Sequence, residues 1–474
     1  MDTMVPFMNV SPQHPLPIDS APPHILRLPD ELQLHIFATM VKTTQSSFSL
    51  LPSLRTCRAF RRLLEGEPSL WTLVRIDSTS FIIRSRILSE PGFSLVVPGV
   101  GRILELSGEQ ELSLTINLLS HDDRMRQLSL TPVMSILREK CFFRCKSITV
   151  RCSDFDHLFD ISQNLIADEE DDYFPLLSLK SLVFWFTSPP GYQLDHPDGS
   201  DSEFWTPIEG WDCCSVPKLT AYGKATIPLL QSVIFHGVPL DYRCFCATRL
   251  TSLAISGVFK RSHPLTRSEL RFALELNQRT LSTLHLGAGA IQTAKEWPEK
   301  RLPLSLPALT GLSIDYLHPD ELRWAAENLH IPRLKGLVIR NFVKCNPELD
   351  AATRDGMCWR HPLAEGTLRA YVSAMDYWPL HQVTHLHMRY ASIPDQRIAQ
   401  LESHFEGREP WAEGTPTSSN FFYQFVSLRV LELYKPDNGV LTTLKYPARH
   451  IEVGQGQRIR IQFFPSLLRY RCVE

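Results

Sequence analysis

One short apolar pattern recurs along this chain and restricts its fold more than any other feature. The pattern is L-x-x-L-x-L, with other apolar residues in place of some leucines, and it occurs nine times between residues 145 and 433. The last two apolar residues of a copy are two apart, as on one face of a strand, so each copy predicts a strand. The copies are Cys145-Ile148-Val150, Leu179-Leu182-Phe184, Leu230-Val233-Phe235, Leu250-Leu253-Ile255, Leu281-Leu284-Leu286, Leu309-Leu312-Ile314, Leu334-Leu337-Ile339, Val383-Leu386-Met388 and Leu428-Leu431-Leu433.

Helical patterns fill several gaps between these copies. Residues 319–329 and 368–375 place apolar side chains at helical spacing, and Thr266 followed by Glu269 resembles a capping box ahead of another helix. The predicted unit is strand, turn, helix, turn. One unit cannot bury its apolar face alone, so we expect an α/β fold in which residues 141–474 form an irregular leucine-rich-repeat solenoid.

A doubly wound α/β sheet also alternates strands with helices and stays open as an alternative. The copies are unevenly spaced, which predicts inserted loops in the repeat region. The segments that suit loops are 168–172, 189–209 and 408–420, because they are rich in charge or turn formers and poor in periodicity.

The composition limits the classes of partner and the cellular location that we expect. With 43% hydrophobic and 10% aromatic residues among 474, the chain can bury a large core. The formal net charge of -2 makes neither nucleic acid nor an anionic membrane an expected partner. Eleven scattered cysteines, no recognisable signal peptide and no long apolar run predict reduced thiols, no membrane span, and a place in the cytoplasm or nucleus.

Motifs for bond chemistry are not found. No glycine-rich phosphate loop and no G-x-S-x-G elbow occur, and we interpret the glycines of residues 287–289 as a repeat turn rather than a nucleotide site. We therefore expect neither an enzyme nor a bound cofactor.

Metal ligands are equally sparse. Cys141, Cys145 and Cys152 lack the paired C-x-x-C spacing of a structural zinc site. His385 and His387 point the same way on an expected strand, opposite the apolar core, but a third ligand is not evident. We predict no metal site, and substrate contact is the favoured role of these two histidines.

The residue between the last two apolar positions of each copy is expected on the concave face of the strands, a frequent binding surface in repeat proteins. The set is mixed and partly apolar, which fits a protein or peptide partner. In the first four copies these residues are Thr149, Val183, Ile234 and Ala254. In the last five, which we predict to contact substrate, they are His285, Ser313, Val338, His387 and Glu432.

The N-terminal region follows a different pattern. Residues 1–24 carry six prolines and predict an unstructured lead. A well-signalled helix follows Pro29, and a second helical pattern spans residues 52–64, with Gly66 as an expected left-handed cap. The short segment 68–71 makes a third piece, so residues 25–75 predict a three-helix module.

The order and spacing of residues in this module resemble the F-box, and the closing helix and Leu-Trp pair look like the fungal F-box proteins with degenerate leucine-rich repeats. The polar connection 42–49 and Phe60, where the family often has Trp, depart from the pattern. The matching residues are Leu28, Pro29, Glu31, Leu32, Ile36, Phe37, Leu51, Leu54, Cys57, Arg58, Leu70 and Trp71.

The resemblance implies a substrate-receptor subunit of an SCF-type cullin-RING ubiquitin ligase, which docks a Skp-family adaptor through the F-box and a protein substrate through the repeats. Two alternatives remain. The same residues can form the core of a helical cap, and the chain can be a repeat scaffold without a ligase. Between the module and the repeats, residues 76–140 are expected as a linker or atypical capping repeats. By the resemblance, the adaptor contacts are Leu28, Pro29, Leu32, Ile36, Phe37 and Leu54.

Overall fold

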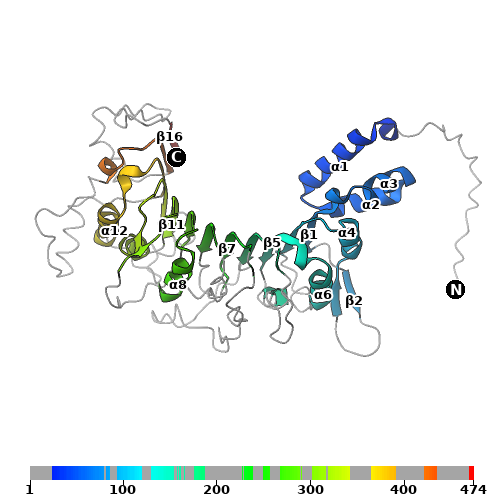
Figure 1. The fold of residues 1–474 in the computed structure, drawn as a ribbon, viewed down its shortest axis with the longest axis horizontal. Coiled ribbons are helices and arrows are strands. Elements are labelled where there is room, and N and C mark those ends of the chain that lie inside the picture. Colours follow the sequence, from blue (N-terminus) through cyan, green and yellow to red (C-terminus); the bar gives the residue numbers. More distant parts are fainter. Residues whose placement is uncertain are drawn as a thin grey trace, which may run out of the picture.

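A computed structural model shows a helical module at one end of a long curved sheet (Figure 1). The predicted lead, apart from His24, and the three predicted inserted loops lie outside the residues that it describes. Those residues are 24–78, 82–85, 93–119, 130–153, 157–158, 160–161, 165, 176–186, 227, 229–238, 249–256, 267–288, 290, 302–316, 319–341, 364–390, 421–434 and 469–473.

Three α-helices and three short 3-10 helices form the N-terminal module. In chain order they are η1 (His24–Arg27), α1 (Asp30–Thr44), η2 (Ser47–Leu50), α2 (Leu51–Thr56), α3 (Arg58–Glu65) and η3 (Pro68–Trp71). Asp30 and Glu31 lie in the first turn of α1, where carboxylates interact favourably with the positive end of the helix dipole. The predicted helical module is confirmed.

Two details of that prediction are wrong. Residues 52–64 do not form one helix, because Cys57 is extended (φ -156°, ψ 164°) and separates α2 from α3. The Cys57 Sγ accepts a 3.4 Å hydrogen bond from the Phe60 amide and so caps α3. Gly66 has φ -78° rather than a left-handed conformation. The left-handed residue is Gln45 (φ 54°), which ends α1.

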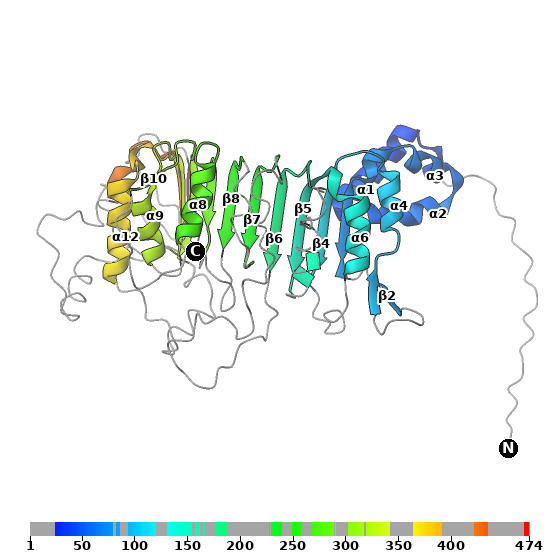
Figure 2. The ribbon, with the colours of Figure 1, turned by 60° about the horizontal axis from the view of Figure 1, so that its bottom comes forward.

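Twelve strands form one sheet in which each strand pairs in parallel with the next (Figure 2). The strand order follows the chain, without the reversal at which a doubly wound sheet changes direction, so that alternative is wrong here. The strands are β1 (Leu73–Asp77), β4 (Leu112–Leu118), β5 (Cys145–Cys152), β6 (Ser181–Phe186), β7 (Ser232–His236), β8 (Ser252–Ser256), β9 (Thr283–Leu286), β11 (Gly311–Tyr316), β13 (Gly336–Asn341), β14 (His385–Arg389), β15 (Val430–Tyr434) and β16 (Arg469–Val473).

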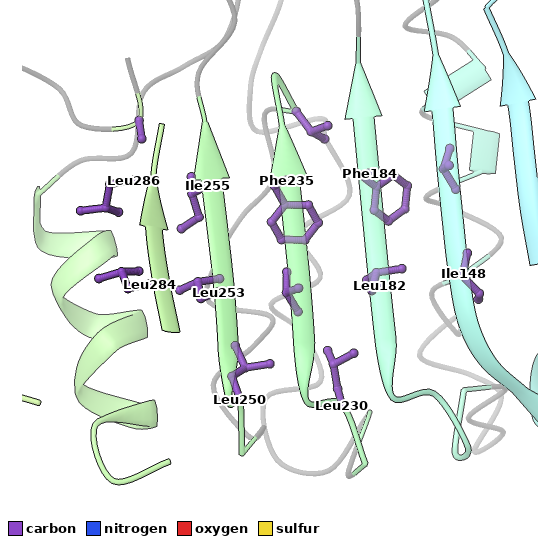
Figure 3. Packing of buried hydrophobic residues seen from close by; sticks show 14 of the residues in the cluster. Ile148, Leu182, Phe184, Leu230, Phe235, Leu250, Leu253, Ile255, Leu284 and Leu286 are labelled. Carbon is purple, nitrogen blue, oxygen red and sulfur yellow. The ribbon is translucent and has the colours of Figure 1, made fainter. Parts of the chain in front are cut away.

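All nine predicted copies contribute a strand to this sheet, β5 to β9, β11 and β13 to β15. Every one of their apolar positions is buried, and the strand positions align across the sheet, as in the row from Ile148 through Leu182 and Val233 to Leu253. Figure 3 shows part of this set, from β5 to β9, on one side of the strands. Burial of this stripe against neighbouring copies explains why the pattern has to recur.

A repeated set of backbone hydrogen bonds joins the turns that precede the strands. The amide groups of Gln231 and Ser232 both donate to the Lys180 carbonyl, at 2.9 and 3.0 Å. The same pair of bonds recurs at each later step of the sheet up to β15. The turn that holds the first leucine of each copy is therefore stacked as regularly as the strand.

The described helices that follow the module lie on the convex side of the sheet, and its concave side, here called the inner face, carries none of them (Figures 1 and 2). The predicted helices over 319–329 and 368–375 and after Thr266 are present as α9, α12 and α8, although Thr266 itself is outside the described residues. These helices are α4 (Val100–Leu106), α6 (Thr131–Lys140), α8 (Arg267–Asn277), α9 (Pro319–Asn328) and α12 (Ala364–Tyr377).

The sheet extends beyond the nine predicted copies at both ends. It begins at Leu73, inside the segment expected to be module and linker, and ends with β16. The buried residues Trp71, at the end of η3, and Val74 and Ile76, in β1, reproduce the spacing of a copy. Two minor sheets stand apart, the antiparallel β2 (Ile82–Ser85) and β3 (Phe93–Val96), and the parallel β10 (Leu304–Ser305) and β12 (Leu329–His330).

Candidate partner-binding surfaces

Helix α1 presents two unlike faces. Gln33, Phe37 and Val41 are buried in the module. Leu32, Ile36 and Met40, at the same four-residue spacing, are 51%, 41% and 37% exposed. A row of large exposed apolar side chains on one helix face is typical of a surface that another molecule covers. The helical-cap alternative requires Leu32 and Ile36 to be buried, and the structure is against it.

The buried face of α1 is held rigidly. The rings of Phe37 and Phe60 meet edge to face at 5.3 Å, and the buried Gln33 amide donates a 2.7 Å hydrogen bond to the Leu28 carbonyl. Phe37 and Leu54, predicted at the adaptor interface, are 4% and 8% exposed. This corrects their assignment, because both side chains belong to the core that supports the exposed row. Leu28 is half-buried and Pro29 is exposed at the start of α1, so those two predictions stand as predictions.

The module and the sheet are joined through Trp71 and Ser47. Trp71 is fully buried, and its indole Nε1 donates a 2.8 Å hydrogen bond to the Leu64 carbonyl. The Ser47 hydroxyl donates to the Leu70 carbonyl at 2.8 Å and accepts from the Leu73 amide, the first residue of β1. Buried contacts therefore join the module that contains α1 to the first strand of the sheet.

The nine residues predicted on the concave face do share one row. Strand register places Thr149 beside Val183 and continues in unbroken sequence to Glu432 on β15. Each of the nine is half-buried. Their common placement on the inner face is confirmed, and their contact with a substrate stays a prediction.

A second row on the same face lies two residues further along each strand and was not predicted. Residues two apart on a strand share a face, so the signal was available in the sequence. The row contains Arg151, Trp185, His236, Ser256, Asp315, Arg340, Arg389 and Tyr434.

Asp315 connects the two rows. Its side chain is only 6% exposed, with Arg340 Nη1 at 3.2 Å and His285 Nε2 at 3.7 Å from its Oδ2. Burial raises the pKa of the Asp315 carboxyl, and His285, Arg340 and Arg389 oppose this rise. Burial likewise lowers the pKa of His285, which favours the neutral ring. Of these two partners, Arg340 lies closer to the buried Asp315 carboxylate than His285 does.

A similar contact set surrounds His387. Its Nε2 accepts a 2.8 Å hydrogen bond from Arg389 Nε, and its Nδ1 lies 3.6 Å from a Glu432 carboxylate oxygen. The Arg389 guanidinium lies 5.9 Å from the centre of the Tyr434 ring. Both ring nitrogens of His387 face protein groups. No set of three or more His, Cys, Asp or Glu in the described part of the chain is arranged to hold a metal ion.

Trp185 and His236 form an aromatic platform at the centre of the inner face. Their rings stack with centroids 4.2 Å apart and 26° between the planes, and Trp185 is 37% exposed. The His236 Nδ1 is hydrogen-bonded to the Ser256 hydroxyl. Burial, and secondarily the nearby His285, lower the pKa of His236 to about 4, so the platform is uncharged at neutral pH.

We expect this platform to make stability depend on pH between about 4 and 6.5. In that window the unfolded chain binds a proton at His236 that the folded chain does not, so stability falls as the pH falls. Urea denaturation at pH 7.5 and pH 5 measures the loss. The His236→Gln variant should show a smaller difference between the two pH values, and an unchanged difference would contradict the assignment.

Gly287 is explained by packing rather than by ligand binding. A Cβ atom at this position would lie 2.2 Å from Ser256 Cβ, and the Gly287 amide donates to the Ile255 carbonyl of the neighbouring copy. The position favours glycine because two copies approach closely, as a repeat turn requires.

Of the three clustered cysteines, Cys141 and Cys145 are buried thiols with sulfur atoms 3.2 Å apart.

Among the described residues, no helix has the length and apolar character needed to cross a membrane.

Comparison with known families adds a direct result for the N-terminal module. The search of curated proteins gives no match. Residues 25–77, which include α1 to α3, η3 and the first strand of the sheet, match the family model of F-box-like domains.

Proposed function

We propose that this chain is the substrate receptor of an SCF-type cullin-RING ubiquitin ligase. The exposed face of α1 binds a Skp-family adaptor, and the inner face of the sheet binds a protein substrate. The observation that carries the proposal is the row of Leu32, Ile36 and Met40, which stands exposed inside a segment that matches the F-box-like family. Complete burial of one fully exposed side chain of this kind is worth about 1.5–3 kcal/mol. The three side chains of the row are already partly buried, so covering them contributes part of that to docking.

The sheet is proposed to be the inner side of a leucine-rich-repeat solenoid. Its support is the chain-ordered parallel sheet, the recurring turn hydrogen bonds and the helices on the convex side. A sheet of this shape offers a long surface at a fixed distance from α1. The fungal character of the resemblance and a location in the cytoplasm or nucleus stay predictions.

In this role the chain performs no bond chemistry. It holds a substrate lysine near the charged ubiquitin-conjugating enzyme and so raises the effective concentration of the reacting groups. The buried contacts of Trp71 and Ser47 support the role, because a rigid joint between α1 and the sheet keeps that geometry fixed.

Co-expression of the tagged full chain with a Skp-family adaptor and a cullin tests the proposal. We expect all three to elute together in size-exclusion chromatography, with the cullin retained only when the adaptor is present. A folded chain that elutes alone would overturn the receptor role. A leucine-rich-repeat scaffold without a ligase would then be the remaining function.

A further inference from the structure

The inner face is not uniform along its length. Its centre, on β6 to β8, is apolar and aromatic, with Val183, Ile234 and Ala254 in one row and the Trp185–His236 stack in the next. Trp185 is the exposed member of this group, at 37%. A flat, uncharged aromatic surface of this kind accepts a large apolar side chain of a partner.

Arginines bound the platform on both sides. Arg151, which is exposed, is the register partner of Trp185 on the preceding strand. Arg340 and Arg389 are register partners on β13 and β14. Arg340 is committed to the buried Asp315, whereas Arg389 contacts a histidine ring and the Tyr434 ring. Arg151 and Arg389 therefore keep donors for a ligand.

The far end of the face is built tightly around Arg389. Tyr390, which follows it, has a positive φ of 50°, a conformation that costs energy for a residue with a bulky side chain. Its amide donates to the Tyr434 carbonyl at 2.9 Å, and the two tyrosine rings meet at 5.2 Å. A strained residue held in this way beside a cation is typical of a binding site.

Charge on the face favours an acidic peptide over a nucleic acid. Across β4 to β15 the described residues of the two central rows contain three arginines, Arg151, Arg340 and Arg389, and two carboxylates, Asp315 and Glu432. A nucleic acid carries a phosphate at every nucleotide and needs a denser cationic track than this. A peptide with a few acidic side chains matches so sparse a set.

We propose that the inner face between β5 and β15 binds an extended acidic segment of a partner protein. A large apolar or aromatic side chain of the segment lies on Trp185, and acidic side chains pair with Arg151 on one side and Arg389 on the other. The inference rests on the proposed function, in which this face receives the substrate.

The strand spacing sets the length of the segment. Six strand-to-strand steps separate Trp185 on β6 from Arg389 on β14. At about 4.8 Å per step they span roughly 29 Å. An extended chain covers this with about eight or nine residues. Arg151 is one step from Trp185, so the second acidic residue lies one or two positions from the apolar one, on its other side.

Selection from a displayed library of random peptides, about 15 residues long to cover the span, tests this on the full-length chain. The wild type should enrich peptides with Trp, Phe or Leu next to an acidic residue and with a second acidic residue about eight positions beyond. With Arg389→Glu, the selected peptides should carry Lys or Arg instead of the distant acidic residue, and the rest of the preference should stay. The variant should bind the peptides selected by the wild type about tenfold more weakly, as expected for a charged contact. Trp185→Ala should remove the aromatic preference.

Matched variants outside the face are Arg333→Glu, at an exposed turn, and Phe272→Ala, on α8, where Phe272 is 41% exposed. Both should select the same peptides as the wild type. If Arg389→Glu fails to fold by urea denaturation, Arg389→Gln replaces it and should lose the distant acidic preference. No enrichment by the wild type, or selections that the face variants leave unchanged, would overturn the inference. Tighter binding of a mixed-sequence single-stranded oligonucleotide than of the selected peptides would also overturn it.

The adaptor co-elution experiment on the same preparation separates this inference from the proposed function. If the chain selects peptides but does not co-elute with the adaptor, the inner-face site stands and the ligase role is contradicted. If the chain co-elutes with the adaptor but enriches no peptides, the ligase role stands and the inner-face site is contradicted.

Discussion

The double variant Leu32→Asp, Ile36→Asp is expected to lose adaptor affinity by about 100-fold or more, which corresponds to about 2.8 kcal/mol. Each change places a carboxylate where an apolar side chain would be desolvated at the centre of the interface. Both positions are exposed in the isolated chain, so the free energy of unfolding should change little. Titration of a labelled adaptor measures the affinity, and urea denaturation measures the stability.

A second pair of exposed apolar residues provides the matched control. Phe272 and Leu276 on α8 are 41% and 43% exposed and four residues apart, like Leu32 and Ile36 on α1. The variant Phe272→Asp, Leu276→Asp adds the same charge to the same kind of helix face. It should bind the adaptor as tightly as the wild type. Equal losses from the two double variants would show that charge, and not the α1 row, decides binding.

Trp71→Ala is expected to lower the free energy of unfolding by about 3–5 kcal/mol. The substitution leaves a cavity where a fully buried indole stood and removes the donor from the Leu64 carbonyl. Because Trp71 closes the module and also precedes β1 at the spacing of a repeat copy, the loss should affect both parts. Urea denaturation followed by far-ultraviolet circular dichroism measures it.

The same substitution at the exposed Trp185 is the control for Trp71→Ala. It should cost about 1 kcal/mol or less, because the indole is partly solvated and leaves no closed cavity. If Trp71→Ala were no more destabilising than Trp185→Ala, the joint between the module and the sheet would not depend on the buried tryptophan.

The sequence predicted the parts of the fold that rest on local spacing. In a parallel stack every copy meets the same surroundings, so the apolar positions repeat and each predicted strand is found. The strands β1 and β4 were missed because the first position holds neither an aliphatic residue nor a cysteine, the types that stand there in the nine predicted copies. Trp71 takes that place before β1, and Glu111 stands there before β4.

Features that depend on pairing between distant segments could not be predicted from the sequence. Trp185 and His236 are 51 residues apart, and only the strand register brings their rings together. Asp315 is buried because Arg340 on the next strand lies beside it, which a single-copy pattern does not reveal. The burial of Phe37 behind the exposed row of α1 likewise follows from the ring of Phe60 on another helix.

Hydrogen–deuterium exchange of the full chain, with and without a Skp-family adaptor, tests the division of labour between the two surfaces. We expect the adaptor to slow exchange of the amides in α1, whose exposed row it covers, and to leave β6 to β15 unchanged for a substrate. Slower exchange on those strands with no change in α1 would contradict the assignment of the adaptor site to the helical module.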